Sequence, residues 1–302
     1  MLDIISVGPG EAVLLTDDAK QAIDRADAVW CAARHAVLVP PEKARPRSPL
    51  EGALEQMRLS SDAGQSAAVL VSGDAGLYSL LEMLKRKIGS EYLRVHPGIS
   101  ALQLFAARLG VSWQDAKILS AHGRALSESA LCHAVRTHRQ TFCFLDAAHN
   151  PAWVRESLTL GGLENVRLFV GERLSYPDER TEAYDPDATY DPLCMAYIEN
   201  DAPESGLPPV GLSDEAFIRG KTPMTKRDVR ALVVSALHLK SNGVVWDIGA
   251  GTGSVSVECA RQCPLGEVYA VEMKDEALDL IRRNAERFHA LNLRVEIGRA
   301  HV

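Results

Sequence analysis

The sequence has no C-x-x-C pair among its six cysteines, no run of about 18 apolar residues and no excess of basic residues. Without paired cysteines we expect neither a zinc site nor a disulfide framework. Without a long apolar run or a basic leader, we expect no membrane span and no signal peptide. The formal net charge of −7 disfavours nonspecific binding to nucleic acid, which needs a basic surface. We therefore predict a cytoplasmic protein with no metal, membrane or nucleic-acid partner.

Length and composition indicate a folded protein of two domains. The chain has 302 residues, of which 46% are hydrophobic and 24% charged, so it can bury a sizeable core. Residues 201–211 are rich in proline and glycine and lack helical or strand periodicity, which is typical of a linker. We place one domain at residues 1–200 and a second at residues 212–302.

Short apolar runs alternate with amphipathic stretches along both domains, which favours an α/β fold with largely parallel sheets. One expected helix covers residues 17–25, with Thr16 as its N-cap. Helices are also expected around Leu131 and Trp153 and at residues 226–239, 254–261 and 275–291. Strands are expected at residues 3–7, 26–30, 67–71, 93–96, 117–119, 141–145, 166–170, 194–199, 243–248, 267–272 and 293–296.

The sharper motif lies in the second domain, where an apolar strand ends at Gly249, Gly251 and Gly253 before a helix. A dinucleotide-binding turn would need its third glycine at position 254, which is serine, so the spacing disfavours NAD. Glycines at alternate positions allow close approach of a ligand without a pyrophosphate, such as S-adenosylmethionine. Glu272 ends the next expected strand, where a carboxylate can accept both ribose hydroxyls.

Residues 217–226 and 246–254 resemble the decarboxylating precorrin methyltransferase domain that modifies ring carbon 15. The resemblance implies a Rossmann-like class I methyltransferase, of which this chain carries the first half of the sheet. It also implies that S-adenosylmethionine is contacted by Thr225, Gly249, Ala250, Gly251, Thr252, Gly253 and Glu272.

Three glycine-bearing turns, at residues 6–10, 72–78 and 96–101, each follow an expected strand of the first domain. The carboxyl ends of parallel strands line one crevice in an open α/β sheet, where ligands bind. The three turns resemble those of the tetrapyrrole methylase family, and Ala33-Arg34-His35 with residues 120–124 and 171–180 resemble its precorrin carbon-5 branch. The resemblance implies a two-subdomain fold in which S-adenosylmethionine is contacted by Gly8, Pro9, Gly10, Gly73, Asp74, Gly76, Ser100 and Ala101.

Together the two resemblances imply a methyltransferase of corrin (vitamin B12) biosynthesis that also decarboxylates an acetate side chain. Transfer from a sulfonium needs alignment of donor and acceptor rather than a strong base, and we identify no catalytic residue. A precorrin carries many carboxylates, which arginine binds with a bidentate fork. The candidates for holding them are Arg34, His35, His122, Arg124 and Arg173.

Three alternatives stay open at this point. The enzyme could methylate another tetrapyrrole position, or the chain could bind S-adenosylmethionine without transferring its methyl group. An NAD oxidoreductase is disfavoured by Ser254. We further expect a homo-oligomer.

The C-terminal end of the chain leads to one more expectation. Residues 297–302 are what one reading frame of a common sequencing adapter would encode, so we expect that ending not to be native. We expect residues 212–302 to be part of a larger domain, poorly stable alone, with an exposed sheet edge and apolar face.

Overall fold

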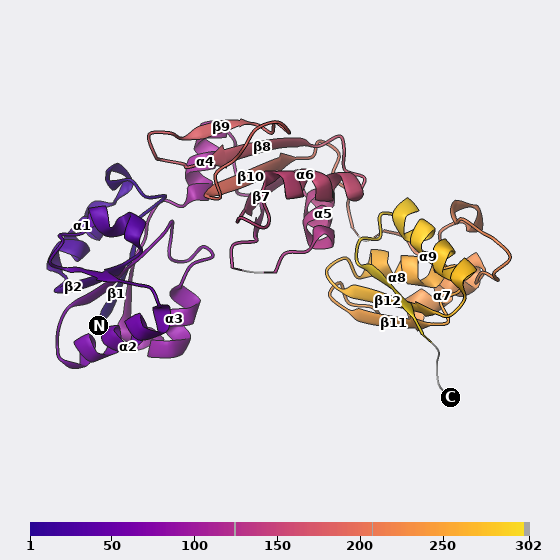
Figure 1. Cartoon of the computed structure of the whole chain (residues 1–302), viewed down its shortest axis with the longest axis horizontal. Helices are drawn as coiled ribbons and strands as arrows, with labels where there is room; N and C mark the ends of the chain where they lie inside the picture. Colours follow the sequence, from indigo (N-terminus) through magenta and orange to yellow (C-terminus); the bar gives the residue numbers. More distant parts are fainter. Residues whose placement is uncertain (124, 207, 299–302) are drawn as a thin grey trace. The chain divides into compact units, whose positions relative to one another are not determined.

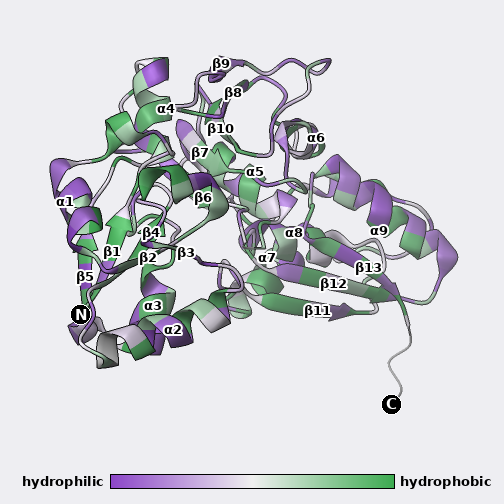
Figure 2. Cartoon of the chain, turned by 60° about the vertical axis from the view of Figure 1, so that its left-hand side comes forward, coloured by the Kyte–Doolittle hydropathy of each residue, from purple (hydrophilic) through white to green (hydrophobic). Residues whose placement is uncertain are grey.

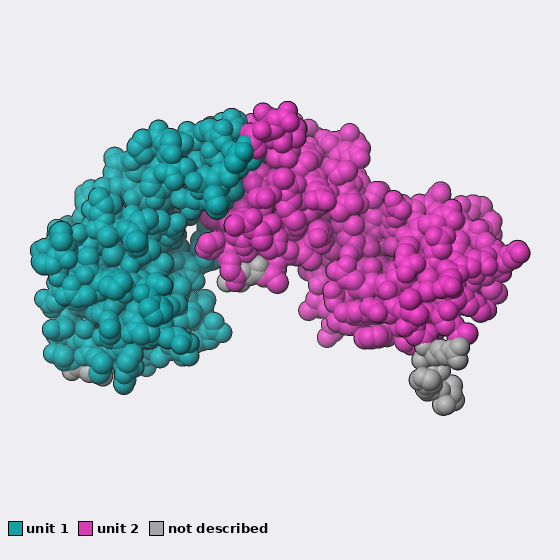
Figure 3. All heavy atoms as spheres, viewed as in Figure 1, with its two compact units in different colours: residues 1–114, 170–182, 189–195 teal, residues 115–169, 183–188, 196–302 magenta. Residues whose placement is uncertain are grey.

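The computed structural model describes residues 1–123, 125–206 and 208–298. The chain divides into two compact units (Figure 3). The first unit contains Met1–Gln114, Val170–Glu182 and Thr189–Met195, and the second contains Asp115–Phe169, Ala183–Ala188 and Ala196–Val302.

The N-terminal sheet has the strand order β3-β2-β4-β1-β5, and its strand pairs are parallel. Its strands are β1 (Leu2–Ser6), β2 (Ala28–Cys31), β3 (Ala44–Pro46), β4 (Ala67–Val71) and β5 (Leu93–His96). Side chains on both faces of β1 and β4 are buried, which explains why these strands appear in the sequence as continuous apolar runs. Figure 2 shows the hydrophobic colour along β1, β2 and β4. The parallel sheet of the first domain is therefore confirmed.

The helices around this sheet are α1 (Asp17–Arg25), α2 (Leu50–Asp62), α3 (Leu81–Ile88) and α4 (Ala101–Leu109), with short 3₁₀ helices at Ala12–Leu14, Ala33–Leu38 and Ser90–Tyr92. Helix α1 has the predicted bounds, and the Thr16 hydroxyl accepts the Ala19 N–H as predicted. Strand β2 begins two residues later than expected, because Ala26 still caps α1 through the Ala22 carbonyl.

A second five-stranded sheet has the order β6-β7-β10-β8-β9. Its strands are β6 (Lys117–Ser120), β7 (Gln140–Phe144), β8 (Arg167–Glu172), β9 (Arg180–Ala183) and β10 (Cys194–Glu199), and its helices are α5 (Glu128–Thr137) and α6 (Pro151–Leu160). The strands β6, β7, β8 and β10 lie within a few residues of the predicted ranges. Strand β9 was not predicted, because its short polar sequence has no apolar alternation.

The C-terminal sheet is parallel, with the order β11-β12-β13, and is the expected half of a Rossmann-like sheet. Its elements are a 3₁₀ turn at Asp214–Ala216, α7 (Arg227–Ala236), β11 (Val244–Ile248), α8 (Ser254–Gln262), β12 (Glu267–Glu272), α9 (Asp275–Arg287) and β13 (Leu293–Ile297). Helix α9 ends four residues before the predicted bound, and the chain soon adopts a left-handed conformation at His289.

Helices α8 and α9 pack on this sheet through a core that includes Val257, Val268 and Ile281 (Figure 1). Alternate residues of β11 point away from that core: Val244, Trp246 and Ile248 are each more than half exposed. The Trp246 ring stacks on Tyr269 of β12, with ring centroids 4.5 Å apart. The expected apolar sheet face at an edge strand is therefore present.

All six cysteines are free and buried, including Cys259 and Cys263 on one face of α8 and its end. In the parts of the chain described above, no helix has both the length and the apolar character needed to cross a membrane.

Candidate functional site

The first two turns of the N-terminal sheet are joined to each other at Gly8 and Gly73. The Gly8 N–H donates to the Gly73 carbonyl at 3.2 Å, and the Gly73 N–H donates to the Gly8 carbonyl at 2.7 Å. Both residues have positive φ, 69° and 66° respectively, a conformation that favours glycine. The sequence order β1, β4 and β5 becomes the spatial order β4-β1-β5, so the ends of the three strands are neighbours.

Polar side chains fasten the third turn to the first two. Asp74 accepts the N–H of Gly98 at 3.2 Å through Oδ2 and that of Gly76 at 2.8 Å through Oδ1. The Ser6 hydroxyl accepts the Ala75 N–H at 2.9 Å. Ser6 and Gly98 belong to the turns noticed in the sequence but were not predicted as site residues. Ser6 and Gly98 matter because the fold brings them together: a Cβ at position 98 would lie 2.7 Å from the Ser6 Cβ, so only glycine fits there.

The turn after β5 leads directly into helix α4. Ser100 caps this helix by accepting the Gln103 N–H at 3.1 Å, and the Gln103 side chain accepts the Ser100 N–H in return. A Cβ added at Gly73 would lie 3.9 Å from the Ser100 Cα and 4.0 Å from the Ala101 nitrogen. The space beside Gly73 therefore adjoins the positive end of α4.

Pro9 and Gly10 complete the first turn and are buried. Gly10 has φ 147°, and the ring of Tyr176 occupies the position that its side chain would need. The structure thus brings the eight N-terminal residues predicted to hold the cofactor onto three adjoining turns, with backbone rather than side chains along much of the surface.

The second candidate site is the loop between β11 and α8. The N–H groups of Gly249 and Ala250 donate to the Val271 carbonyl at 2.8 and 3.1 Å, which holds the loop against the end of β12. Gly249, Gly251 and Gly253 all have positive φ. Asp247 accepts the Ser256 hydroxyl at 2.5 Å, so it supports the first turn of α8.

Glu272 lies at the end of β12 beside this loop. Its carboxylate accepts the N–H groups of Gly251 at 3.0 Å, Met273 at 2.8 Å and Lys274 at 3.2 Å. Burial by itself would raise the pKa of Glu272, but these three donors lower it below the ordinary value of 4.5. The carboxylate therefore stays charged near neutral pH and keeps lone pairs for further donors.

The segment before α7 lies over the same loop. A Cβ at Gly251 would be 3.4 Å from the Pro223 carbonyl oxygen and 3.7 Å from the Thr222 methyl group. The Thr225 carbonyl accepts a hydrogen bond from Arg230 at 2.6 Å. Thr225, also a predicted cofactor residue, is thus anchored close to the loop.

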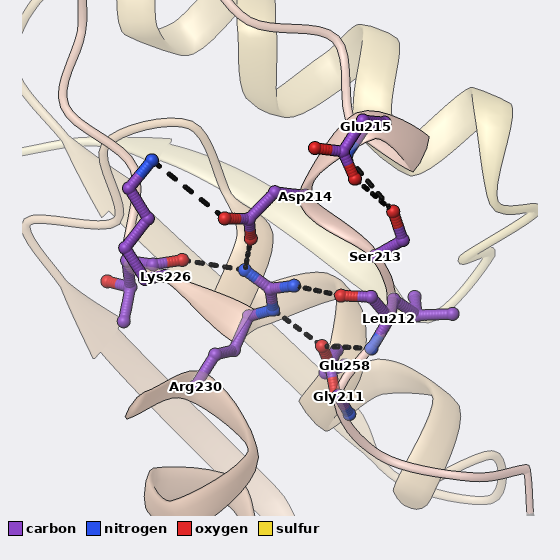
Figure 4. Close-up of polar contacts among 9 residues, drawn as sticks. Gly211, Leu212, Ser213, Asp214, Glu215, Lys226, Arg230 and Glu258 are labelled. Carbon is purple, nitrogen blue, oxygen red and sulfur yellow. Dashed lines mark hydrogen bonds and ion pairs between the residues drawn. The ribbon is translucent and has the colours of Figure 1, made fainter. Parts of the chain in front are cut away.

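Arg230 is the centre of a buried polar network (Figure 4). Its guanidinium is fully buried and pairs with Glu258 of α8 at 2.5 Å and with Asp214 at 3.2 Å. It also donates to the Leu212 carbonyl and lies over the Phe217 ring, 4.6 Å from its centroid. Glu258 in turn accepts the N–H groups of Gly211 and Leu212. The network ties the start of the C-terminal region to α7 and α8 and was not recognised in the sequence, because its members are far apart along the chain.

Among the described residues, the C-terminal loop has open backbone, an unpartnered hydroxyl and a neighbouring carboxylate. A Cβ at Gly249 would meet no atom within 4 Å, so the backbone there is open to a ligand. The Thr252 hydroxyl is buried without a hydrogen-bond partner in the described part of the chain. An acidic side chain near an open glycine loop fits the hydroxyls and amine of an adenosyl cofactor.

The residues predicted to hold substrate carboxylates lie in different surroundings. Arg34 donates to the Ser72 hydroxyl at 2.6 Å, and His35 is buried beside it. His122 is exposed in the turn after β6. Arg173 already pairs with Asp178 at 2.6 Å and with Asp191 at 3.5 Å, so its role in substrate binding stays a prediction. Arg124 lies outside the described residues.

The environment of His35 predicts an effect of pH on stability. Burial, with repulsion by Arg34 and Arg47, lowers the pKa of His35 from 6.5 to about 4. Between these values the unfolded chain binds the proton and the folded chain does not, so stability falls as pH drops from 6.5 to 4. The free energy of unfolding should fall by on the order of 3 kcal/mol over this range. His35→Gln should remove this dependence on pH, because glutamine does not titrate. Hydrogen exchange of peptides from β2, followed between pH 4 and 7, measures this pH dependence of stability. If His35→Gln kept the same dependence as the wild type, the prediction would be wrong. The control is His122→Gln, since His122 is exposed.

Comparisons with known proteins match two separate ranges of the chain. The family model of tetrapyrrole (corrin/porphyrin) methylases matches residues 1–185, and that of the precorrin methyltransferase domain matches residues 215–302. A precorrin-6Y C(5,15)-methyltransferase (decarboxylating) from Sinorhizobium sp. is 32% identical over 313 residues, which cover 99% of this chain and 74% of the relative.

Two further similarities each concern one part of the chain. A probable cobalt-precorrin-6B C(15)-methyltransferase (decarboxylating) from Pyrobaculum calidifontis is 51% identical over 80 residues, which cover 26% of this chain and 41% of that protein. The crystal structure of a precorrin-6Y methylase of cobalamin biosynthesis from Archaeoglobus fulgidus has a TM-score of 0.50 and 22% identity, covering 67% of this chain and 98% of that one. At this identity the structural likeness concerns the fold alone.

Proposed function

The chain belongs to the tetrapyrrole (corrin/porphyrin) methylase family, and we propose on this basis that it is an S-adenosylmethionine-dependent C-methyltransferase acting on a precorrin in cobalamin biosynthesis. The relative that aligns with nearly the whole chain is a precorrin-6Y C(5,15)-methyltransferase (decarboxylating). We assign methylation of carbon 5 to residues 1–200 and the carbon-15 methylation and decarboxylation to a domain that begins at residue 212.

The observation that carries this proposal is the joining of the three N-terminal turns. Gly8, Gly73 and Gly98 place their backbones side by side at the carboxyl ends of three parallel strands. Asp74 and Ser6 accept hydrogen bonds from the N–H groups of Gly98 and Ala75, respectively. The space beside Gly73 adjoins the amino end of α4. This arrangement offers a cofactor a preformed surface with few side chains to move.

When bound, S-adenosylmethionine supplies a methyl group that is already electrophilic. The protein's task is then to hold an electron-rich ring carbon in line with it and to exclude water. The turns at Gly8, Gly73 and Gly98 serve as the rigid cofactor platform, and the basic residues serve to orient the carboxylates of the ring. Neither function needs a strong base, which agrees with the lack of a recognised catalytic residue.

The C-terminal site supports a second methyl transfer by the same reasoning. Glu272 and the loop at Gly249–Gly253 offer a carboxylate beside open backbone, and the Thr222–Thr225 segment lies over it. The matched carbon-15 relative is about twice as long as the region that aligns with it. We therefore propose that the loop at Gly249–Gly253 belongs to a carbon-15 methyltransferase domain.

The test is incubation of the purified chain with methyl-labelled S-adenosylmethionine and a precorrin-6 substrate, followed by NMR of the product. Label on carbon 5 supports the proposal. Label on another ring position would favour the alternative of a different tetrapyrrole methylase, and binding of the cofactor without transfer would favour a sensor. Release of CO₂ with a second label would extend the assignment to carbon 15. A cytoplasmic location and a homo-oligomeric state stay predictions from the sequence.

A further inference from the structure

A small cavity with an apolar wall and a basic edge lies at the carboxyl end of β2, within the first compact unit. Its volume is about 290 Å³. Ala32, Ala33, Ala36 and Ala44 line it together with Arg45 and Arg47. The cavity is one strand away from the turn at Gly73, because β2 pairs with β4 in the sheet.

Three guanidinium groups at or next to this cavity, those of Arg34, Arg45 and Arg47, have no carboxylate partner in the described ranges. Arg45 donates to the Glu42 and Ala44 carbonyls at 2.8 and 2.9 Å. Arg34 donates to the Ser72 hydroxyl at 2.6 Å and to a ring nitrogen of His35 at 3.2 Å. Arg47 is half-buried, and its side chain reaches only the Leu70 carbonyl, at 3.4 Å. The Arg34 and Arg47 side chains therefore reach the end of β4, at Ser72 and Leu70, and burial followed by the charge of Arg34 lowers the pKa of Arg47. Arg34 is exposed and Arg47 half-buried, so a carboxylate from solution can reach both guanidinium groups and offset their charges.

His35 provides a second, independent observation. Its side chain is fully buried. Because the Arg34 Nε can only donate, the His35 Nε2 must accept, so the proton of the neutral ring is on Nδ1. This Nδ1 has no hydrogen-bond partner among the described residues. A buried N–H without an acceptor costs about 1–3 kcal/mol, so His35 is kept in this place at a cost while its other ring nitrogen accepts from Arg34.

We propose that Arg34 and Arg47 bind one carboxylate side chain of the tetrapyrrole, with its methylene groups against the alanine wall and His35 holding Arg34 in position. The proposal rests on the proposed function, because it names the part of that substrate that the site takes. A carboxymethyl or carboxyethyl side chain of the tetrapyrrole is complementary to the cavity, because its apolar stem matches the alanine wall and its anionic end matches the arginines. Arg47, which was not predicted from the sequence, becomes a residue that determines substrate affinity.

The kinetic test compares Arg34→Gln and Arg47→Gln with the wild-type chain in the methyl-transfer assay. Loss of one charged hydrogen-bonded pair should raise KM about 10- to 100-fold. Affinity for S-adenosylhomocysteine and kcat should change little, because the cofactor turns are intact. Arg47→Lys should recover part of the affinity, since it keeps the charge but loses the fork. The matched control is Arg58→Gln on α2, whose ion pair with Glu55 is exposed.

Two outcomes would overturn the proposal: an unchanged KM in both glutamine variants, or an equal loss of S-adenosylhomocysteine binding, which would indicate a structural role only.

A binding test examines the site without requiring methyl transfer. Uroporphyrin, a porphyrin octacarboxylate, should bind the wild type about 10-fold more tightly than Arg47→Gln by fluorescence titration. Equal binding would contradict the site, whereas absence of methyl transfer with this difference intact would count against the proposed function alone. Displacement of uroporphyrin by equimolar inorganic phosphate would assign the site to free phosphate and overturn the tetrapyrrole assignment.

Discussion

Gly73→Trp is expected to abolish binding of S-adenosylhomocysteine at the N-terminal site, with a loss of affinity greater than about 100-fold. Gly73 has φ 66°, a conformation that costs other residues about 1–3 kcal/mol. Its Cβ would point toward the Ser100 Cα, 3.9 Å away, so an indole would fill the space beside the amino end of α4. Calorimetric titration of the full chain measures the effect directly.

The controls for this titration use two other glycines. Gly52 lies on α2 with no atom within 4 Å of an added Cβ, so Gly52→Trp should bind like the wild type. Gly251→Trp reports on the C-terminal loop. Binding lost with Gly73→Trp but insensitive to Gly251→Trp would assign the measurable affinity to the three N-terminal turns. Wild-type affinity in Gly73→Trp would contradict that assignment, and no binding by the wild type would refute the methyltransferase proposal.

Glu258→Gln is expected to destabilise the C-terminal region by about 3–5 kcal/mol, because it leaves the Arg230 charge buried with a single carboxylate. Arg230 and Glu258 are 0% and 1% exposed, so water cannot replace the lost partner. The variant also weakens the contacts to the Gly211 and Leu212 N–H groups. Hydrogen exchange of peptides covering residues 211–262 should show the loss, together with weaker cofactor binding through the Thr222–Thr225 segment.

The control for this network is Glu286→Gln on α9, where the side chain is exposed and a change below about 0.5 kcal/mol is expected. Replacing both partners, with Arg230→Met and Glu258→Leu, should recover part of the stability, because no unpaired charge remains. Unchanged exchange protection in Glu258→Gln would show that the ion pair does not hold this region together.

The sequence predicted the strands with the strongest apolar runs more accurately than the polar edge elements. Strands β4 and β10 have the predicted bounds, whereas β3 and β9 were not expected. A strand buried on both faces must be apolar at nearly every position, so it is visible in the sequence. An edge strand such as Ala44–Pro46 is polar and contains proline, which matches no strand pattern.

The candidate sites show a similar division. The glycine turns were found because a turn with positive φ or close contact restricts the residue type locally. Arg47 was missed, since nothing near it in the sequence distinguishes it from a surface arginine. Its significance comes from Arg34, thirteen positions earlier, and from the absence of a carboxylate partner within the described residues. Arg173, which looked equally available in the sequence, is instead paired with Asp178 and Asp191.

The sequence by itself determined the α/β class, the positions of the glycine turns and the family, because backbone conformation and apolar periodicity depend on neighbouring residues. Only the tertiary structure decided which charges are compensated. Arg230 pairs with Glu258 from 28 positions away, Arg173 pairs within its own turn, and Arg34 and Arg47 have no carboxylate partner in the described ranges. The strength of an ion pair depends on distance and burial, and both are set by the fold rather than by the order of residues.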